Sequence, residues 1–166
     1  MPMTPFVERF PELGARETKS AKILDPQDLP VGEYGFFEFY CDEPGCDCRR
    51  VTIFVLRPET GWSKVWATIT YGWETLDFYR EWGGEHSDPV EMKGPDLDIL
   101  NRQSEYSPAL LRLFESLIES PAYVERLKRH YGMFRESVDS EHGYRVRQEF
   151  NRLQNRRKRL RDPRRR

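Results

Sequence analysis

The sequence predicts an α+β fold in which an antiparallel β-meander of about three strands packs against helices. Three segments of strand length follow one another, and each is rich in β-branched and aromatic residues. They are YGFFEFYC (34–41), RVTIFVLR (50–57) and KVWATITYGW (64–73). Amphipathic helical patterns then follow in the second half of the chain, which places the helices after the strands instead of between them.

The alternation of side chains favours strands over helices in these three segments. In the second segment Val51, Ile53 and Val55 share one face, as a side-chain period of two requires. The sequence PETG (58–61) separates the second segment from the third, with proline early and glycine late, which is typical of a hairpin connection. We therefore expect consecutive strands to pair.

Helix start signals recur in the second half. TLDFYREW (75–82) predicts a short helix before a Gly-Gly pair, and residues 85–106 read as a loop. Ser107-Pro108 and Ser120-Pro121 each place a serine N-cap before a proline at the first helical position. Two helices with apolar stripes are therefore predicted to begin at these pairs.

A last helix is predicted to begin at about Glu141 and to run into the arginine-rich tail. Its early turns contain Val146, Phe150 and Leu153, which are expected to pack on the body. His142, next to its start, is expected to be a cap or a surface residue.

Composition divides the chain into three parts. Residues 1–33 mix proline, glycine and charge and are predicted to form an extended arm, with aromatic and aliphatic side chains pinning it to the body. Residues 34–144 are predicted to form an α+β metal-binding domain, and residues 145–166 a basic helical or disordered tail. A chain of 166 residues, of which 37% are hydrophobic and 33% charged, suits one domain with a polar extension.

Charge is separated along the chain. Residues 145–166 hold 11 of the 27 basic residues and two of the 28 acidic ones, a net charge of +9, and the rest of the chain carries −10. Arginines neutralise phosphates, so a nucleic acid or an acidic protein is a possible partner of the tail. The alternatives are a solvated helix end or a tail that rests on an acidic body, its own or a neighbour's. The candidate contacts are Arg152, Arg156, Arg157, Lys158, Arg159 and Arg161.

The chain shows no targeting or membrane signal. Its first residues have no basic segment followed by an apolar run, and no stretch approaches the 18 or so apolar residues of a membrane span. We expect a cytoplasmic protein with no membrane association. In a reducing compartment, clustered cysteines point to metal or redox chemistry more than to disulfides.

All three cysteines lie within eight positions, at the predicted turn between the first two strands. Such a turn brings Cys41, Cys46 and Cys48 together without help from distant parts of the chain. Thiolates are preferred ligands of Zn²⁺, at about 2.3 Å. The sequence therefore predicts one zinc ion per chain, with Arg49 and Arg50 offsetting the thiolate charge or donating hydrogen bonds around it.

A closed structural zinc site needs a fourth ligand. His130 is preferred because it lies on the apolar face of its predicted helix, from which an imidazole could reach the cysteine turn. A histidine in that position is more often a core residue than a ligand. His86, in a glycine-rich loop, is the second choice, and Asp42 and Asp47 within the turn stay open.

Other functions stand beside the structural metal site. Cys46 and Cys48 could cycle between dithiol and disulfide in a redox-sensing protein, or the thiols could be inert. A zinc-dependent or thiol-based enzyme is a further alternative, for example with a Cys48–His130 pair. The sequence contains no His-Glu-x-x-His and no His-x-Glu motif, so it favours a non-enzymatic zinc-binding interaction module.

The aromatic stretch YGWETLDFYREW (71–82) has two interpretations. Its tyrosines, tryptophans and phenylalanine could line a ligand pocket with Glu74 and Glu81 as polar anchors. Aromatic residues at these spacings are more often core between a sheet and a helix, and we favour that interpretation.

The string YCDEPGCDCRRVTI, followed by ATITYGWE, FYREW and LKRHYGMF, resembles a family of small, uncharacterised bacterial proteins. The resemblance covers roughly residues 34–135, without the arm and most of the tail. It implies a cysteine cluster and lends no catalytic residue.

Overall fold

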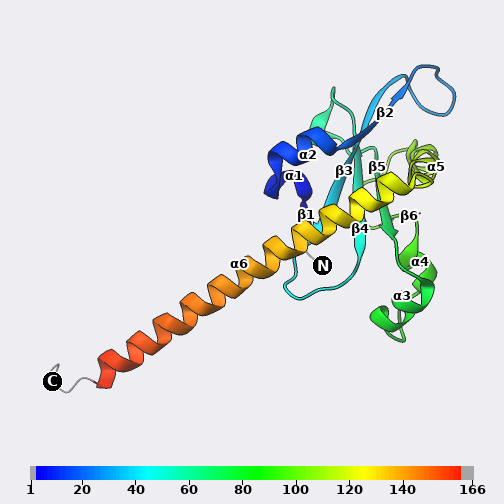
Figure 1. Ribbon diagram of the computed structural model, residues 1–166. Helices are drawn as coiled ribbons and strands as arrows, with labels where there is room; N and C mark the ends of the chain where they lie inside the picture. Colours follow the sequence, from blue (N-terminus) through cyan, green and yellow to red (C-terminus); the bar gives the residue numbers. More distant parts are fainter. Residues whose placement is uncertain (1–2, 162–166) are drawn as a thin grey trace.

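A computed structural model of the chain describes the backbone of residues 3–161 and the side chains of residues 3–153. The fold is α+β, as predicted: an antiparallel sheet is covered on one face by helices, and one long helix extends beyond the body (Figure 1).

The predicted meander forms the centre of the sheet. Strands β3 (Gly32–Cys41), β4 (Arg50–Leu56) and β5 (Ala67–Gly72) pair antiparallel in sequence order, with Phe36 opposite Val55. The alternation predicted for β4 is confirmed, because Val51, Ile53 and Val55 are all buried under the helices. Short β-branched side chains fill this face because they suit a pleated surface in contact with a core.

The prediction of an extended arm over residues 1–33 is wrong for the described part. Strands β1 (Met3–Pro5) and β2 (Lys19–Ile23) pair one after the other with the free edge of β3, and helices α1 (Phe6–Arg9) and α2 (Pro11–Glu17) lie between them. An uncovered edge strand offers unpaired backbone groups, and the first residues of the chain satisfy them. They are an integral part of the sheet.

The helices after the meander largely follow the prediction. Helix α3 (Leu76–Gly83) is confirmed, and α5 (Ser107–Ile118) begins at the first Ser-Pro pair. The region expected to be a loop contains a short helix, α4 (Pro89–Lys93), and a two-residue strand, β6 (Asp96–Leu97), that pairs with β5. A single 3₁₀ turn, η1 (Gly61–Ser63), lies in the connection before β5.

The two separate helices predicted after Ser120 are one. Helix α6 (Pro121–Arg161) runs without a break through the region where a new start was expected at Glu141. That region contains serine, aspartate and glycine but no proline, so no backbone N–H is lost. Ion pairs one turn apart, Arg135 with Asp139 and Glu141 with Arg145, support the helix on either side of the expected break.

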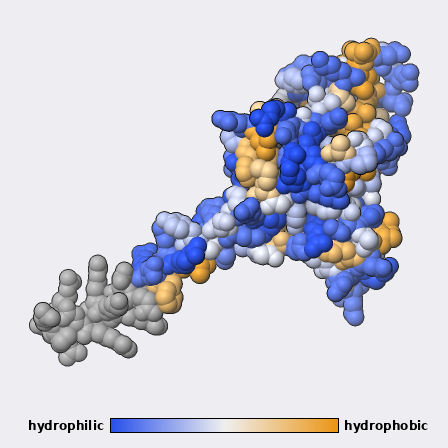
Figure 2. Space-filling model, in the orientation of Figure 1, coloured by the Kyte–Doolittle hydropathy of each residue, from blue (hydrophilic) through white to orange (hydrophobic). Residues whose placement is uncertain are grey.

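The part of α6 beyond the body is exposed. Val146, Phe150 and Leu153, expected to pack on the body, have 53%, 60% and 49% of their surface exposed, so that prediction is wrong. The surface of this segment is mainly hydrophilic with small apolar spots (Figure 2). His142 is at the surface, as expected.

Candidate metal centre

The three cysteine thiols converge at the end of the β3–β4 hairpin. Cys41 is the last residue of β3, and Cys46 and Cys48 follow in the turn. The three sulfur atoms all lie within 4.8 Å of one another. Zn–S bonds of about 2.3 Å at tetrahedral angles require sulfur atoms about 3.8 Å apart, so small side-chain movements suffice for all three to bind one ion.

Glycine permits the turn that gathers the thiols. Gly45 has a φ of 74°, in the left-handed region that favours residues without a Cβ atom. Its backbone N–H donates to Asp139 Oδ1 of α6 at 2.9 Å. Helix α6 therefore fixes the tip of the turn directly.

Two further side chains of α6 hydrogen-bond to backbone groups at the two ends of the turn. The Arg135 guanidinium donates to the Cys41 carbonyl at 2.8 Å and to Asp139 at 2.8 Å, and Tyr131 Oη accepts from the Arg49 backbone N–H at 3.2 Å. These contacts come from residues more than 80 positions away in the sequence. The thiol group is therefore preorganised by tertiary contacts as well as by the hairpin.

Arg49 has a positive φ, 49°, which is uncommon for a residue with a side chain. Hydrogen bonds on both sides hold its backbone in this conformation, because Tyr79 Oη donates to its carbonyl at 2.8 Å and Tyr131 accepts from its N–H. Its guanidinium pairs with Asp47 and Glu74. The side chain that we expected to support the thiols is therefore engaged elsewhere.

Burial raises the pKa of each of the three thiols, Cys41, Cys46 and Cys48. Backbone N–H groups of Glu43 and Arg50 hydrogen-bond Cys41 and Cys48 and oppose that rise. Reactive cysteines have lowered pKa values, and none of these three thiols has its pKa lowered. N–H groups directed at sulfur are what a metal-bound thiolate requires.

His130 does not lie with the thiols, which corrects the prediction that it is the fourth ligand. Its ring is 1% exposed and stacks on Phe6, with ring centroids 4.1 Å apart. Nδ1 lies 2.6 Å from Glu38 Oε2, and Nε2 lies 2.9 Å from Glu17 Oε2. Both nitrogens are therefore bound to carboxylates, as in a satisfied core histidine.

The carboxylates of the turn are also engaged. Asp42 accepts a hydrogen bond from the Thr4 hydroxyl at 2.7 Å, and both Asp47 oxygens accept from Arg49. Among the residues whose side chains the structure describes, no histidine, aspartate or glutamate joins the thiol group. The described part of the chain therefore gathers three candidate ligands at this site, all of them thiols.

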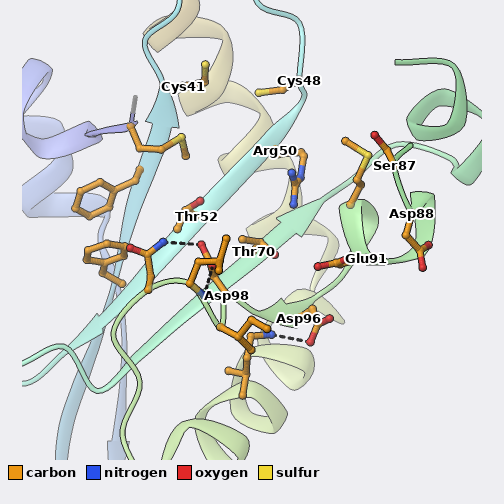
Figure 3. A pocket seen from close by; sticks show the side chains of 18 of the residues that line it. Cys41, Cys48, Arg50, Thr52, Thr70, Ser87, Asp88, Glu91, Asp96 and Asp98 are labelled. Carbon is orange, nitrogen blue, oxygen red and sulfur yellow. Dashed lines mark hydrogen bonds between the residues drawn. The ribbon is translucent and has the colours of Figure 1, made fainter. Parts of the chain in front are cut away.

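A groove of about 710 Å³ opens beside the thiols, on the sheet face opposite α6 (Figure 3). Cys41 and Cys48 lie at one end of it, and Arg50, Thr52 and Thr70 form part of its floor. The segment between α3 and β6 and the residues after β6 form the wall, which includes His86, the second choice for the fourth ligand. His86 is exposed and does not lie with the three thiols.

The aromatic stretch 71–82 is packed and does not line this groove. Tyr79 is fully buried. The ring of Tyr71 contacts that of Phe114 edge-on, with centroids 5.9 Å apart, and the ring centroids of Trp73 and Tyr131 lie 5.2 Å apart. The favoured interpretation, core between sheet and helix, agrees with these contacts.

The predicted polyanion contacts lie at or beyond the end of the described side chains. Arg152 is exposed on the projecting part of α6. The other five, Arg156, Arg157, Lys158, Arg159 and Arg161, lie outside the residues whose side chains the structure describes.

Sequence reasoning missed the residues of α6 that support the turn and the polar floor of the groove. Arg135 and Asp139 are four residues apart on a helix, a spacing equally typical of a surface ion pair. Thr52 and Thr70 were visible only as the alternate face of two strands. In neither case does local sequence reveal which distant groups these side chains will lie beside.

No known protein family, curated protein or solved structure matches this chain. The resemblance of residues 34–135 to small bacterial proteins therefore stays a prediction. No helix in the described part of the chain combines the length and apolarity needed to cross a membrane.

Proposed function

We propose that this protein binds one Zn²⁺ through Cys41, Cys46 and Cys48 and serves as a non-enzymatic interaction module. The mutual approach of the three sulfur atoms, all within 4.8 Å, carries the proposal. Three soft donors at this separation suit Zn²⁺, and the backbone N–H groups around them suit thiolates. The ion ties the end of β3 to the start of β4.

The position of the turn supports a stabilising role for the ion. The turn contacts α6 through Arg135 and Asp139 and α3 through Tyr79, so an ion at the thiols would strengthen a junction of three elements. A ligand present at 100 times its dissociation constant stabilises the native state by about 2.7 kcal/mol. For a chain of this size we expect chelation to lower the melting temperature by about 5–10 °C.

Metal analysis of protein purified without chelator tests the proposal. We expect about one zinc per chain in the wild type, and loss of zinc to a competing chelator in Cys46→Ser and Cys48→Ser. Asp47→Asn is the matched control, because Asp47 lies between two of the ligands but binds only Arg49. A Cys48→Ser protein that holds zinc as firmly as the wild type would contradict the three-thiol site.

A second candidate function, polyanion binding, is favoured by the projection of α6. The helix carries exposed Arg145, Arg147 and Arg152 away from a body of net negative charge (Figure 1). A basic helix held clear of an acidic body can approach a nucleic acid or an acidic protein with less repulsion.

Affinity for a single-stranded RNA over a salt series tests this candidate. Removing residues 145–166 leaves Glu141 and its ion pair with Arg9 in place, so the body keeps its contacts with α6. We expect a loss of affinity and a shallower salt dependence in the truncated chain, and a partial loss when Arg152, Arg156 and Arg157 become glutamine. Equal affinity of the full and truncated chains would exclude the tail as the binding site.

A further inference from the structure

A continuous polar strip joins the thiol group to the floor of the groove. Cys48, Arg50 and Thr52 follow one another at every second position along the chain entering β4, and Thr70 of β5 lies directly opposite Thr52. Alternate residues of a strand are about 6.8 Å apart and face the same side. All four side chains line the same groove (Figure 3).

Arg50 is the unusual member of this strip. Its Nε atom is buried and has no hydrogen-bond partner, and its guanidinium forms no ion pair with any residue in the described part of the chain. A buried polar atom is nearly always satisfied in a folded protein, so an arginine whose Nε has no partner and which lines a groove is a candidate contact for an anionic ligand. Arginine binds carboxylates through two parallel hydrogen bonds.

Two hydroxyl groups lie beside Arg50 and are also uncommitted. Within the described residues, neither the Thr52 nor the Thr70 hydroxyl takes part in a hydrogen bond. Both can donate to an oxygen of the same anion.

The acidic side chains of the groove do not neutralise Arg50. Asp88 accepts from the Val90 backbone N–H at 2.8 Å, Asp96 from its neighbour's N–H at 2.8 Å, and Asp98 from the Leu100 N–H at 3.1 Å. These carboxylates serve the backbone of the wall. Glu91 on the same wall forms no ion pair with Arg50.

The other end of the strip is the thiol group itself. Cys41 and Cys48 line the groove, and no fourth protein ligand from the described residues joins them. Zinc with three protein ligands keeps its fourth position for another molecule, and soft thiolates suit zinc.

We infer that the groove binds a small thiol carboxylate, whose sulfur takes the fourth metal position and whose carboxylate pairs with Arg50, Thr52 and Thr70. This inference rests on the proposed zinc site. On binding, the ligand thiol releases its proton to solvent and forms a metal–sulfur bond, and nothing is oxidised. The spacing of Cys48 and Arg50 along the chain fits a ligand of a few carbon atoms.

Cobalt substitution tests the inference, because Co²⁺ reports thiolate ligation and coordination geometry by visible absorption. The holoprotein loaded with Co²⁺ is titrated with 3-mercaptopropionate and, separately, with 2-mercaptoethanol, which lacks the carboxylate. We expect 3-mercaptopropionate to change the cobalt spectrum with about tenfold higher affinity, the value of one good charged hydrogen-bonding pair. In Arg50→Gln most of this preference should be lost, because only the two threonine hydroxyls then remain to bind the carboxylate.

Arg49→Gln is the matched control. It removes a guanidinium from the same turn, but one that pairs with Asp47 and Glu74 and does not line the groove. The preference for the carboxylate should persist in this variant. His86→Ala should leave both the cobalt spectrum and the preference unchanged.

The outcomes separate this inference from the proposed function. A wild-type protein with no thiolate-to-cobalt absorption would overturn the metal site and the groove inference with it. Thiolate absorption that neither thiol alters, equal affinities in the wild type, or a preference that is undiminished in Arg50→Gln would overturn the groove inference alone. A cobalt spectrum altered by His86→Ala would show that the chain closes the site itself, and would also overturn it.

Discussion

Replacing His130 by leucine should destabilise the protein by about 3–5 kcal/mol and leave the proposed zinc site intact. The imidazole lies between two carboxylates, at 2.6 Å from Glu38 and 2.9 Å from Glu17. Glu38 is 5% exposed, and its other oxygen already lacks a hydrogen-bond partner. Leucine would leave that carboxylate with the Tyr40 hydroxyl as its remaining partner among the described residues.

The magnitude follows from the burial of Glu38 and from the hydrogen bonds that the imidazole makes. Each hydrogen bond to a charged group contributes about 1.5–3 kcal/mol, and removing one partner of a buried pair leaves the desolvation cost of the other. The variant also lacks the stacking of the ring on Phe6. The apolar volume of leucine offsets only part of this, because it fills space but donates no hydrogen bond.

Urea unfolding followed by circular dichroism measures the change, and metal analysis of the same sample measures zinc. Arg129→Gln is the matched control: Arg129 is the neighbour of His130 and also pairs with Glu17, but its side chain is 55% exposed. The control should cost under about 1 kcal/mol. A His130→Leu protein as stable as this control would refute the reasoning about the buried pair, and loss of zinc on its own would restore His130 as a ligand.

Three further predictions concern the His130–Glu17 contact, the glycine of the cysteine turn and the contact of Arg135 with that turn. The hydrogen bond from His130 lowers the pKa of Glu17, so this carboxylate stabilises the folded state above the unfolded pKa of about 4.5, and the stabilisation is lost as pH falls through the lower folded pKa. The stability of Glu17→Gln to acid should therefore depend less steeply on pH below about 4.5 than that of the wild type. An unchanged slope contradicts this. Gly45→Ala should lower the free energy of unfolding in urea by about 1–2 kcal/mol, because the φ of Gly45 is positive. Gly132→Ala, at an open site in α6, should raise that free energy by about 0.5–1 kcal/mol. Changes of the same sign in the two variants would exclude a backbone origin. Arg135→Gln removes the charged donor to the Cys41 carbonyl and should weaken zinc retention in a chelator competition about tenfold or more, and undiminished retention would show that α6 does not preorganise the turn.

Local pattern was sufficient for the central sheet. The alternation in residues 50–57 and the turn residues at 58–61 identify strands and their pairing, because a side-chain period of two and a short hairpin connection are properties of neighbouring residues. The gathering of the three thiols was predictable for the same reason: Cys41, Cys46 and Cys48 belong to one hairpin, whose turn brings them together.

Tertiary structure decided which distant groups each side chain contacts. The apolar position of His130 on its helix was visible in the sequence, but which group its ring would meet depended on α2 and β3, and those elements present carboxylates in place of thiols. The first residues of the chain looked irregular because each strand there is only three to five residues long. They become ordered by pairing with the free edge of β3, which no local pattern encodes.

The sequence by itself determined the three central strands, the helices at 76–83 and 107–118, and the hairpin with its cluster of thiols, since all of these depend on residues close together in the chain. Only the folded chain decided that, among its described residues, no histidine or carboxylate joins the three thiols, that α6 holds the turn, and that a groove with an unpaired Arg50 Nε begins at the thiols. These features depend on which faces of distant elements meet, and packing across the whole core sets that arrangement.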